Sequence, residues 1–99
     1  MVKLVILFRQ SSDPDFDERY HQNLALLEKM PGIRRRMVSM VHGSPEGVPA
    51  FERILELYFD DREALEAALG SPEGQAAGHD LMTFARQDAF VLFADVYED

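Results

Sequence analysis

Few side chains in this sequence could take part in chemistry, and they are scattered among apolar residues. The chain has no cysteine, which excludes disulfide bonds, thiolate catalysis and sulfur-ligated metals. No two histidines lie one helical turn apart, and there is no nucleophile motif or glycine-rich phosphate loop. The sequence therefore predicts no metal site and no cofactor, and it identifies no catalytic residue.

Tyr20 and Asn23 are the first pair of polar residues that could form a site. They lie three residues apart, on or beside the apolar stripe of an expected helix. In one interpretation they line a pocket between this helix and a sheet and form hydrogen bonds to a small apolar or aromatic ligand. In the other, Tyr20 is a core residue with its hydroxyl at the boundary, and Asn23 is a surface amide.

Glu56 and Tyr58 are the second pair, and they share one face of an expected strand. A carboxylate between Ile54 and Tyr58 in a covered sheet is costly unless it is paired or protonated. We therefore expect Glu56 to be either an acid kept protonated by burial or the partner of an arginine across the strand or across a dimer. We favour the ion pair.

Composition limits the class of protein. The 99 residues form a single domain, and 46% of them are hydrophobic, as in ordinary globular proteins. The net charge of −8 argues against nonspecific binding to nucleic acid or to anionic membranes. The apolar run from Leu4 to Phe8 is too short for a signal peptide, and no run is long enough to span a membrane. We expect a soluble cytoplasmic protein.

The elements that must position these residues follow from hydrophobic periodicity. Strands are expected over residues 2–9, 33–42, 51–59 and 89–97. A helix is expected between Asp13-Pro14 and Pro31-Gly32, and a short and a longer helix follow the third strand. This order predicts an α+β, ferredoxin-like βαββαβ fold, with a four-stranded antiparallel sheet in the order 4-1-3-2 and the helices on one face.

Two helix starts can be assigned to capping residues. Asp60 is expected to cap the short helix, with Glu63 three residues later closing a capping box. Ser71, followed by Pro72 and Glu73, is expected to cap the longer helix.

Both faces of the expected sheet carry apolar residues, but the helices can cover only one. A second face of this kind needs another cover, and the simplest is a second copy of the chain. We therefore expect a homodimer with its two sheets face to face. The residues that led to this expectation are Val5, Leu7, Val38, Met40, Ile54, Tyr58, Val91 and Phe93.

Four segments resemble the EthD family of small dimeric α/β-barrel proteins. They are VKLVILFR at the start, KMPGIRR from Lys29 to Arg35, ELYFDDREALEAAL and SPEGQAAGHDL. The resemblance covers nearly the whole chain, and it implies a ferredoxin-like protomer and a barrel made by two protomers. The family is named after a component of ether-degradation gene clusters that include a haem monooxygenase system.

The resemblance implies less about activity. Members are often labelled oxidoreductases, and the wider superfamily includes cofactor-free monooxygenases, isomerases and haem-binding enzymes. Many relatives carry a histidine on the first helix where this chain has Asn23, which can bind a ligand but cannot serve as a general base near neutral pH. His21 is two residues away and is expected on the solvated side of the helix.

His79 lies on the helix that carries the axial haem ligand in some relatives of the superfamily. A lone histidine is weak evidence for haem, so we favour a solvent-facing or helix-capping role. His42, at the end of the second strand, is expected at the edge of a loop.

Two function classes follow from the sequence. The first is a protein of oxidative catabolism that binds a small apolar or aromatic molecule and resembles a cofactor-independent monooxygenase. The second is a non-catalytic dimeric module.

Overall fold

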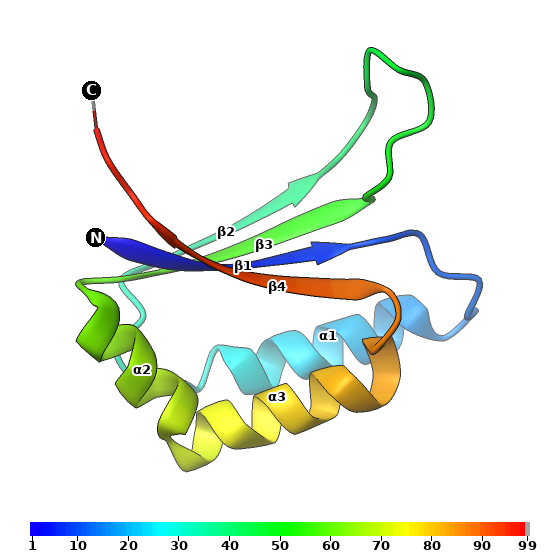
Figure 1. Cartoon of the computed structure of the whole chain (residues 1–99). Coiled ribbons are helices and arrows are strands. Elements are labelled where there is room, and N and C mark those ends of the chain that lie inside the picture. Colours follow the sequence, from blue (N-terminus) through cyan, green and yellow to red (C-terminus); the bar gives the residue numbers. More distant parts are fainter. Residues whose placement is uncertain (99) are drawn as a thin grey trace.

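The structure, a computed structural model, describes residues 1–98 and contains one four-stranded sheet and three helices. The elements follow the predicted order of strand, helix, strand, strand, short helix, longer helix and strand (Figure 1). Their bounds are β1 Val2–Phe8, α1 Phe16–Leu27, β2 Arg35–Met40, β3 Arg53–Phe59, α2 Arg62–Gly70, α3 Pro72–Ala85 and β4 Ala89–Asp95.

The sheet has the order β2-β3-β1-β4, and every neighbouring pair is antiparallel. This confirms the predicted βαββαβ ferredoxin-like topology. All three helices lie on one side of the sheet, and its other side is open (Figure 1). The turn between α1 and β2 passes through Gly32, whose φ of 83° is a conformation that residues with a Cβ rarely adopt.

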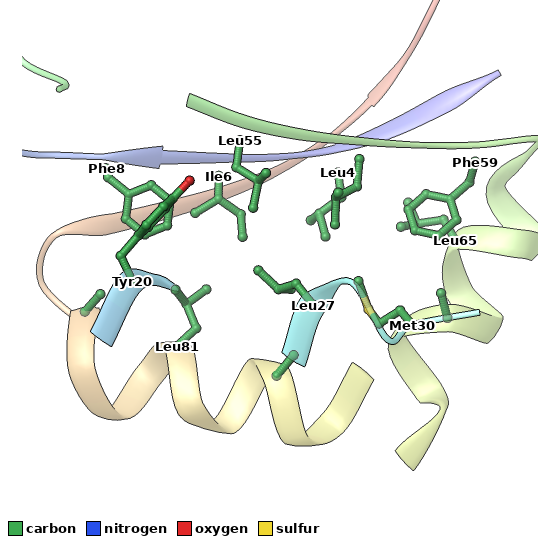
Figure 2. Close-up of a cluster of buried hydrophobic side chains, with 14 of the residues drawn as sticks. Leu4, Ile6, Phe8, Tyr20, Leu27, Met30, Leu55, Phe59, Leu65 and Leu81 are labelled. Carbon is green, nitrogen blue, oxygen red and sulfur yellow. The ribbon is translucent and has the colours of Figure 1, made fainter. Parts of the chain in front are cut away.

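The core lies between the helices and the two central strands. Alternate residues of β1 and β3 point toward the helices, as the two-residue period predicts, and they are almost fully buried. Tyr20, Leu27 and Leu81 approach them from α1 and α3 (Figure 2). The strand residues on this side are Val2, Leu4, Ile6, Phe8, Leu55, Leu57 and Phe59.

The open face is also largely apolar near its centre. The strand registers place Val5 opposite Glu56 and Leu92, and Leu7 opposite Ile54 and Phe90. Val5 is only 9% exposed although no helix covers it, because its neighbours in the sheet surround it.

Four of the residues predicted for the open face lie on the other side. The register pairs Val38 and Met40 of β2 with inward-facing residues of β3, and Val91 and Phe93 of β4 with inward-facing residues of β1. The prediction was wrong for these residues because both edge strands carry apolar residues on both faces. Their sequences therefore do not indicate which alternate residues face the helices. All four remain exposed, since the helices cover mainly the central strands.

The two caps have different outcomes. Ser71 caps α3 as predicted, because its hydroxyl accepts a hydrogen bond from the Gly74 N–H at 3.0 Å. The prediction for α2 was wrong by one residue. Asp61, not Asp60, accepts from the Ala64 N–H at 2.8 Å. The Asp60 carboxylate instead accepts hydrogen bonds from Nε and Nη2 of Arg34, which lower the pKa of Asp60.

Candidate functional site

A buried arginine lies between the start of α1 and the end of the sheet. Arg53 is 5% exposed, and its guanidinium carbon lies 4.4 Å from the ring centre of Tyr20 and 5.2 Å from that of Phe16. Its Nη2 donates to Asp17 Oδ1 and to Glu52 Oε1, both at 2.7 Å. Two carboxylates and two aromatic faces therefore compensate the buried charge.

Two polar atoms of this cluster have no hydrogen-bond partner within residues 1–98: the hydroxyl of Tyr20 and the Nε of Arg53. Buried groups of this kind are normally paired, because an unpaired one loses its hydration without compensation. Burial raises the pKa of Tyr20, and the neighbouring Arg53 lowers it by a smaller amount, so the hydroxyl stays protonated at neutral pH. Both atoms can therefore donate to an oxygen atom that is not part of the chain.

The sequence analysis did not select Arg53. The available signal was its position, since an arginine at an inward-facing position of β3 cannot reach water as easily as an arginine on the open face.

Asn23 is buried, with 1% of its surface exposed, so the interpretation as a surface amide is wrong. Its Nδ2 donates to the Ala77 carbonyl at 3.0 Å and to Asp80 Oδ2 at 2.9 Å, and both acceptors belong to α3. These bonds link the two long helices, and they use both N–H donors of the amide. A ligand-binding role for Asn23 stays a prediction.

Glu56 and Tyr58 share the open face, and the structure adds Lys3 to them. Lys3 Nζ donates to Glu56 Oε2 at 2.6 Å, and the Tyr58 hydroxyl lies 3.4 Å from the same oxygen. The side chains of Lys3 and Glu56 are 27% and 17% exposed. The predicted ion pair is therefore present, but its cation is a lysine of the neighbouring strand and not an arginine.

The three histidines are all exposed. His21 lies on the solvated side of α1, as predicted, and its Nδ1 is 2.7 Å from the Asp17 carbonyl oxygen. His79 points to solvent on α3, and His42 follows β2 at the edge of a loop. Residues 1–98 contain no cluster of three or more side chains that could hold a metal ion, and no helix among them is long and apolar enough to cross a membrane.

The sequence analysis also missed a hollow of about 360 Å³ between α2 and the edge strand β4. Two of its lining residues form an ion pair, in which Arg62 Nε and Nη2 donate to the two oxygens of Asp95 at 3.1 and 2.5 Å. A second hollow of about 310 Å³ shares Val2 and both members of this pair. The larger hollow is lined by Val2, Arg62, Leu65, Glu66, Leu69, Phe93, Ala94 and Asp95.

Comparison with known proteins gives one family. The EthD domain matches residues 9–88. An ethyl tert-butyl ether D (EthD) family protein of Bacillus halodurans is 37% identical over 98% of this chain and 99% of its own, with a TM-score of 0.91. An uncharacterized 11.0 kDa protein from the thcB-thcC intergenic region of Rhodococcus erythropolis is 29% identical over 96% of this chain and 94% of its own.

More distant structures share the fold alone. A dimeric ferredoxin-like protein of unknown function from Jannaschia is 19% identical over 96% of this chain and 98% of its own, with a TM-score of 0.76. SnoaB, a cofactor-independent oxygenase of Streptomyces nogalater, is 16% identical over 99% of this chain and 93% of its own, with a TM-score of 0.66. At these identities the likeness does not carry activity from one chain to another.

Proposed function

This chain belongs to the EthD domain family, and from that premise we propose that it is a homodimer that binds a small, mostly apolar or aromatic molecule in oxidative catabolism. The observation that carries the proposal is the pair of buried polar atoms without partners, the Tyr20 hydroxyl and Arg53 Nε. The ligand would supply one oxygen atom that accepts from both. This assignment keeps Tyr20 in the orienting role predicted from the sequence and adds Arg53.

The surroundings of the two donors favour a ligand with a ring or an alkyl group. Phe8 and Phe16 pack against Tyr20, with ring centres 5.2 and 6.4 Å away. A neutral carbonyl or hydroxyl group fits this site better than a carboxylate, because Asp17 and Glu52 already neutralise Arg53. In an oxygenase-like reaction the substrate itself would have to supply the reactivity, since neither donor is a general base at neutral pH.

Dimerisation is the second part of the proposal, and it is supported by the open face. Val5, Leu7 and Ile54 lie there beside the Lys3–Glu56 ion pair, and no helix within residues 1–98 covers them. A partner sheet would remove this apolar surface from water. Glu56 and Tyr58 would then lie inside the barrel, between the two sheets.

Replacing Ile54 with aspartate tests the dimer. A buried, unpaired charge costs several kcal/mol, so we expect Ile54→Asp to run as a monomer in light scattering at micromolar concentration. Val48→Asp, on a loop residue that is 90% exposed, is the matched control and should leave the dimer intact. A wild-type protein that is monomeric at that concentration would refute the dimer.

The ligand site is tested with a thermal-shift screen of small aromatic ketones, which can accept hydrogen bonds but cannot donate them, repeated with Tyr20→Phe. Removing an unpaired hydroxyl should leave the melting temperature of the free protein unchanged or raised, and should abolish the shift caused by hits. Tyr97→Phe, at a residue that is 83% exposed, is the control. Hits that stabilise Tyr20→Phe as strongly as the wild type would contradict the proposed site.

The alternative, a dimeric module without a ligand, is favoured by the close packing around Tyr20. The rings of Phe8, Phe16 and Phe84 and the guanidinium of Arg53 lie around this region. Core side chains also lie between α1 and the sheet, Tyr20 and Leu27 among them (Figure 2). A buried water could then satisfy the two donors. A dimer that gives no hit in the ligand screen is the result expected of such a module.

A further inference from the structure

The hollow between α2 and β4 lies at the opposite end of the sheet from Tyr20 and Arg53. Val2, at the start of β1, lines the hollow, and Phe8, at the end of the same strand, contacts Tyr20. Six residues of strand separate the two by about 20 Å. An inference about the hollow therefore stands apart from the proposed function.

Apolar side chains from three elements meet in the hollow without filling it. Leu65 and Leu69 come from α2, Val2 from β1 and Phe93 from β4. Phe93 remains 61% exposed although it is on the helix side of the sheet, because α2 does not cover the edge strand. The volume of about 360 Å³ is at the lower end of the range for small-molecule pockets and suits a single ring with small substituents.

The rim of the hollow discriminates between charged and neutral ligands. Arg62 is bound by both oxygens of Asp95, and this hydrogen bonding raises the pKa of Arg62 and lowers that of Asp95, so both groups are charged at neutral pH. Glu66 adds a second carboxylate to the lining, and its charge also acts on Arg62. A ligand carboxylate would meet two carboxylates and no free cation, whereas a hydroxyl could donate to them.

We propose that this hollow is a binding site for a small neutral molecule with one apolar ring and one hydroxyl group. The ring lies against Phe93 and Leu69, and the hydroxyl donates to a carboxylate of the rim. The site is half open, so the ligand enters from the side of β4 without a rearrangement of the core. The three probes 4-methylphenol, toluene and 4-methylbenzoate separate the roles of ring, hydroxyl and charge, because they share the ring and the methyl group.

Amide NMR titrations of the full-length 15N-labelled protein test the site. We expect 4-methylphenol to shift the signals of Leu65, Leu69 and Phe93. Toluene should bind about tenfold more weakly, because it lacks a hydrogen bond to a charged acceptor. 4-Methylbenzoate should shift none of these signals. Shifts that cluster elsewhere, or no shifts with any probe because a partner chain fills the hollow, would overturn the proposal.

Variants sharpen the test. Phe93→Ala should weaken binding of 4-methylphenol about tenfold through lost ring contact, whereas Met82→Ala, on the exposed side of α3, should leave it unchanged. If Phe93→Ala fails to fold by circular dichroism, Leu69→Ala takes its place. Tyr20→Phe should also have no effect here, which separates this site from the one proposed above.

Asp95→Asn tests directly whether the Arg62–Asp95 ion pair excludes a ligand carboxylate. It leaves Arg62 without its anionic partner, so 4-methylbenzoate should now bind and shift the signals of Leu69 and Phe93. The preference for the neutral phenol over the acid should fall by about tenfold or more, which is the effect of one charge-assisted hydrogen bond. A preference that is the same in Asp95→Asn and the wild type would overturn the role of the ion pair.

Discussion

The sheet face under the helices and the open face use similar strand residues but cover them differently. Leu57 of β3 points into the helix layer and is fully buried, whereas Ile54 of the same strand points to the open face and is partly exposed. Each face also holds a partly or fully buried cation that is paired with acid: Arg53 inside the helix layer and Lys3 on the open face. The chain thus completes one face by itself and leaves the other open.

Aliphatic side chains on the two faces contribute differently to the free energy of unfolding. Each buried aliphatic side chain under the helices contributes to the stability of the protomer, at any protein concentration. In the proposed dimer, an aliphatic side chain of the open face contributes fully only when the second sheet covers it, so its effect would depend on protein concentration.

The largest expected effect separates the two faces on one strand. Leu57→Ala should lower the free energy of unfolding by about 2–5 kcal/mol, because it opens a cavity in the core. Ile54→Ala should cost about 1 kcal/mol in the dilute protomer and more at concentrations where the dimer forms. Urea denaturation at two protein concentrations measures both. Equal, concentration-independent losses for the two variants would show that the faces do not differ in this way.

The helix layer itself depends on a close approach at the corner between α2 and α3. A Cβ added at Gly74 would lie 2.1 Å from the Ala68 carbonyl oxygen, which is backbone and cannot move aside easily. We expect Gly74→Ala to cost about 3 kcal/mol.

Gly78, one turn later on α3, is the matched control. A Cβ added there meets no atom within 4 Å, so Gly78→Ala should raise the free energy of unfolding by about 0.5–1 kcal/mol. A thermal denaturation series with both variants measures the contrast. Similar melting temperatures for Gly74→Ala and Gly78→Ala would mean that the corner is looser than the structure shows.

A smaller effect is expected at the start of α3. The Ser71 hydroxyl accepts from Gly74 N–H and donates to the Ala68 carbonyl at 2.6 Å, so it satisfies groups of both helices at the corner. Ser71→Ala should cost about 1 kcal/mol, measured by urea denaturation. Ser71→Thr, which keeps the hydroxyl, should restore most of this loss. An unchanged midpoint for Ser71→Ala would contradict the role of the cap.

The fold could be predicted from the sequence because its signals are local and redundant. The alternation in β1 and β3 specifies which residues face the helices, and Ser71-Pro72 marks a helix start that does not depend on tertiary contacts. Asp60 and Asp61 could not be told apart, since adjacent acids fit the same capping signal and the partner of Asp60, Arg34, is 26 residues away.

The candidate sites could be predicted only in part. Glu56 and Tyr58 were placed on one face by their spacing, but the partner of Glu56 depended on the register with β1, which brings in Lys3. The only signal for Arg53 was its inward-facing position on β3, and the hollow beside Phe93 was missed because it follows from packing between elements. The burial of Asn23 against α3 could not be predicted either. Helical periodicity shows which residues share a face of α1, but it does not identify the element that packs against that face.

The smallest expected effect concerns the ion pair of the open face and its dependence on pH. The hydrogen bond from Lys3 to Glu56 raises the pKa of Lys3 above its usual value of 10.5, against the opposing effect of burial. Because the pKa is higher in the folded state, the stabilisation is complete below the usual pKa and is lost as pH rises through the pKa of folded Lys3. The coupling between the two side chains should be about 0.5 kcal/mol near neutral pH, as for a partly exposed pair.

The titration can be followed by 13C NMR of the lysine side chains, since the chain has two lysines and Lys29 gives an internal reference signal. Glu56→Gln should lower the pKa of Lys3, because the hydrogen bond to a carboxylate is lost while burial remains. A double-mutant cycle with Lys3→Met and Glu56→Gln measures the coupling, which should vanish above the pKa of Lys3. An unchanged Lys3 titration in Glu56→Gln would show that the carboxylate does not hold the lysine. In that case the polar part of the open face would rest on the contacts of Lys3 and Arg35 with the Tyr58 ring, which are insensitive to Glu56.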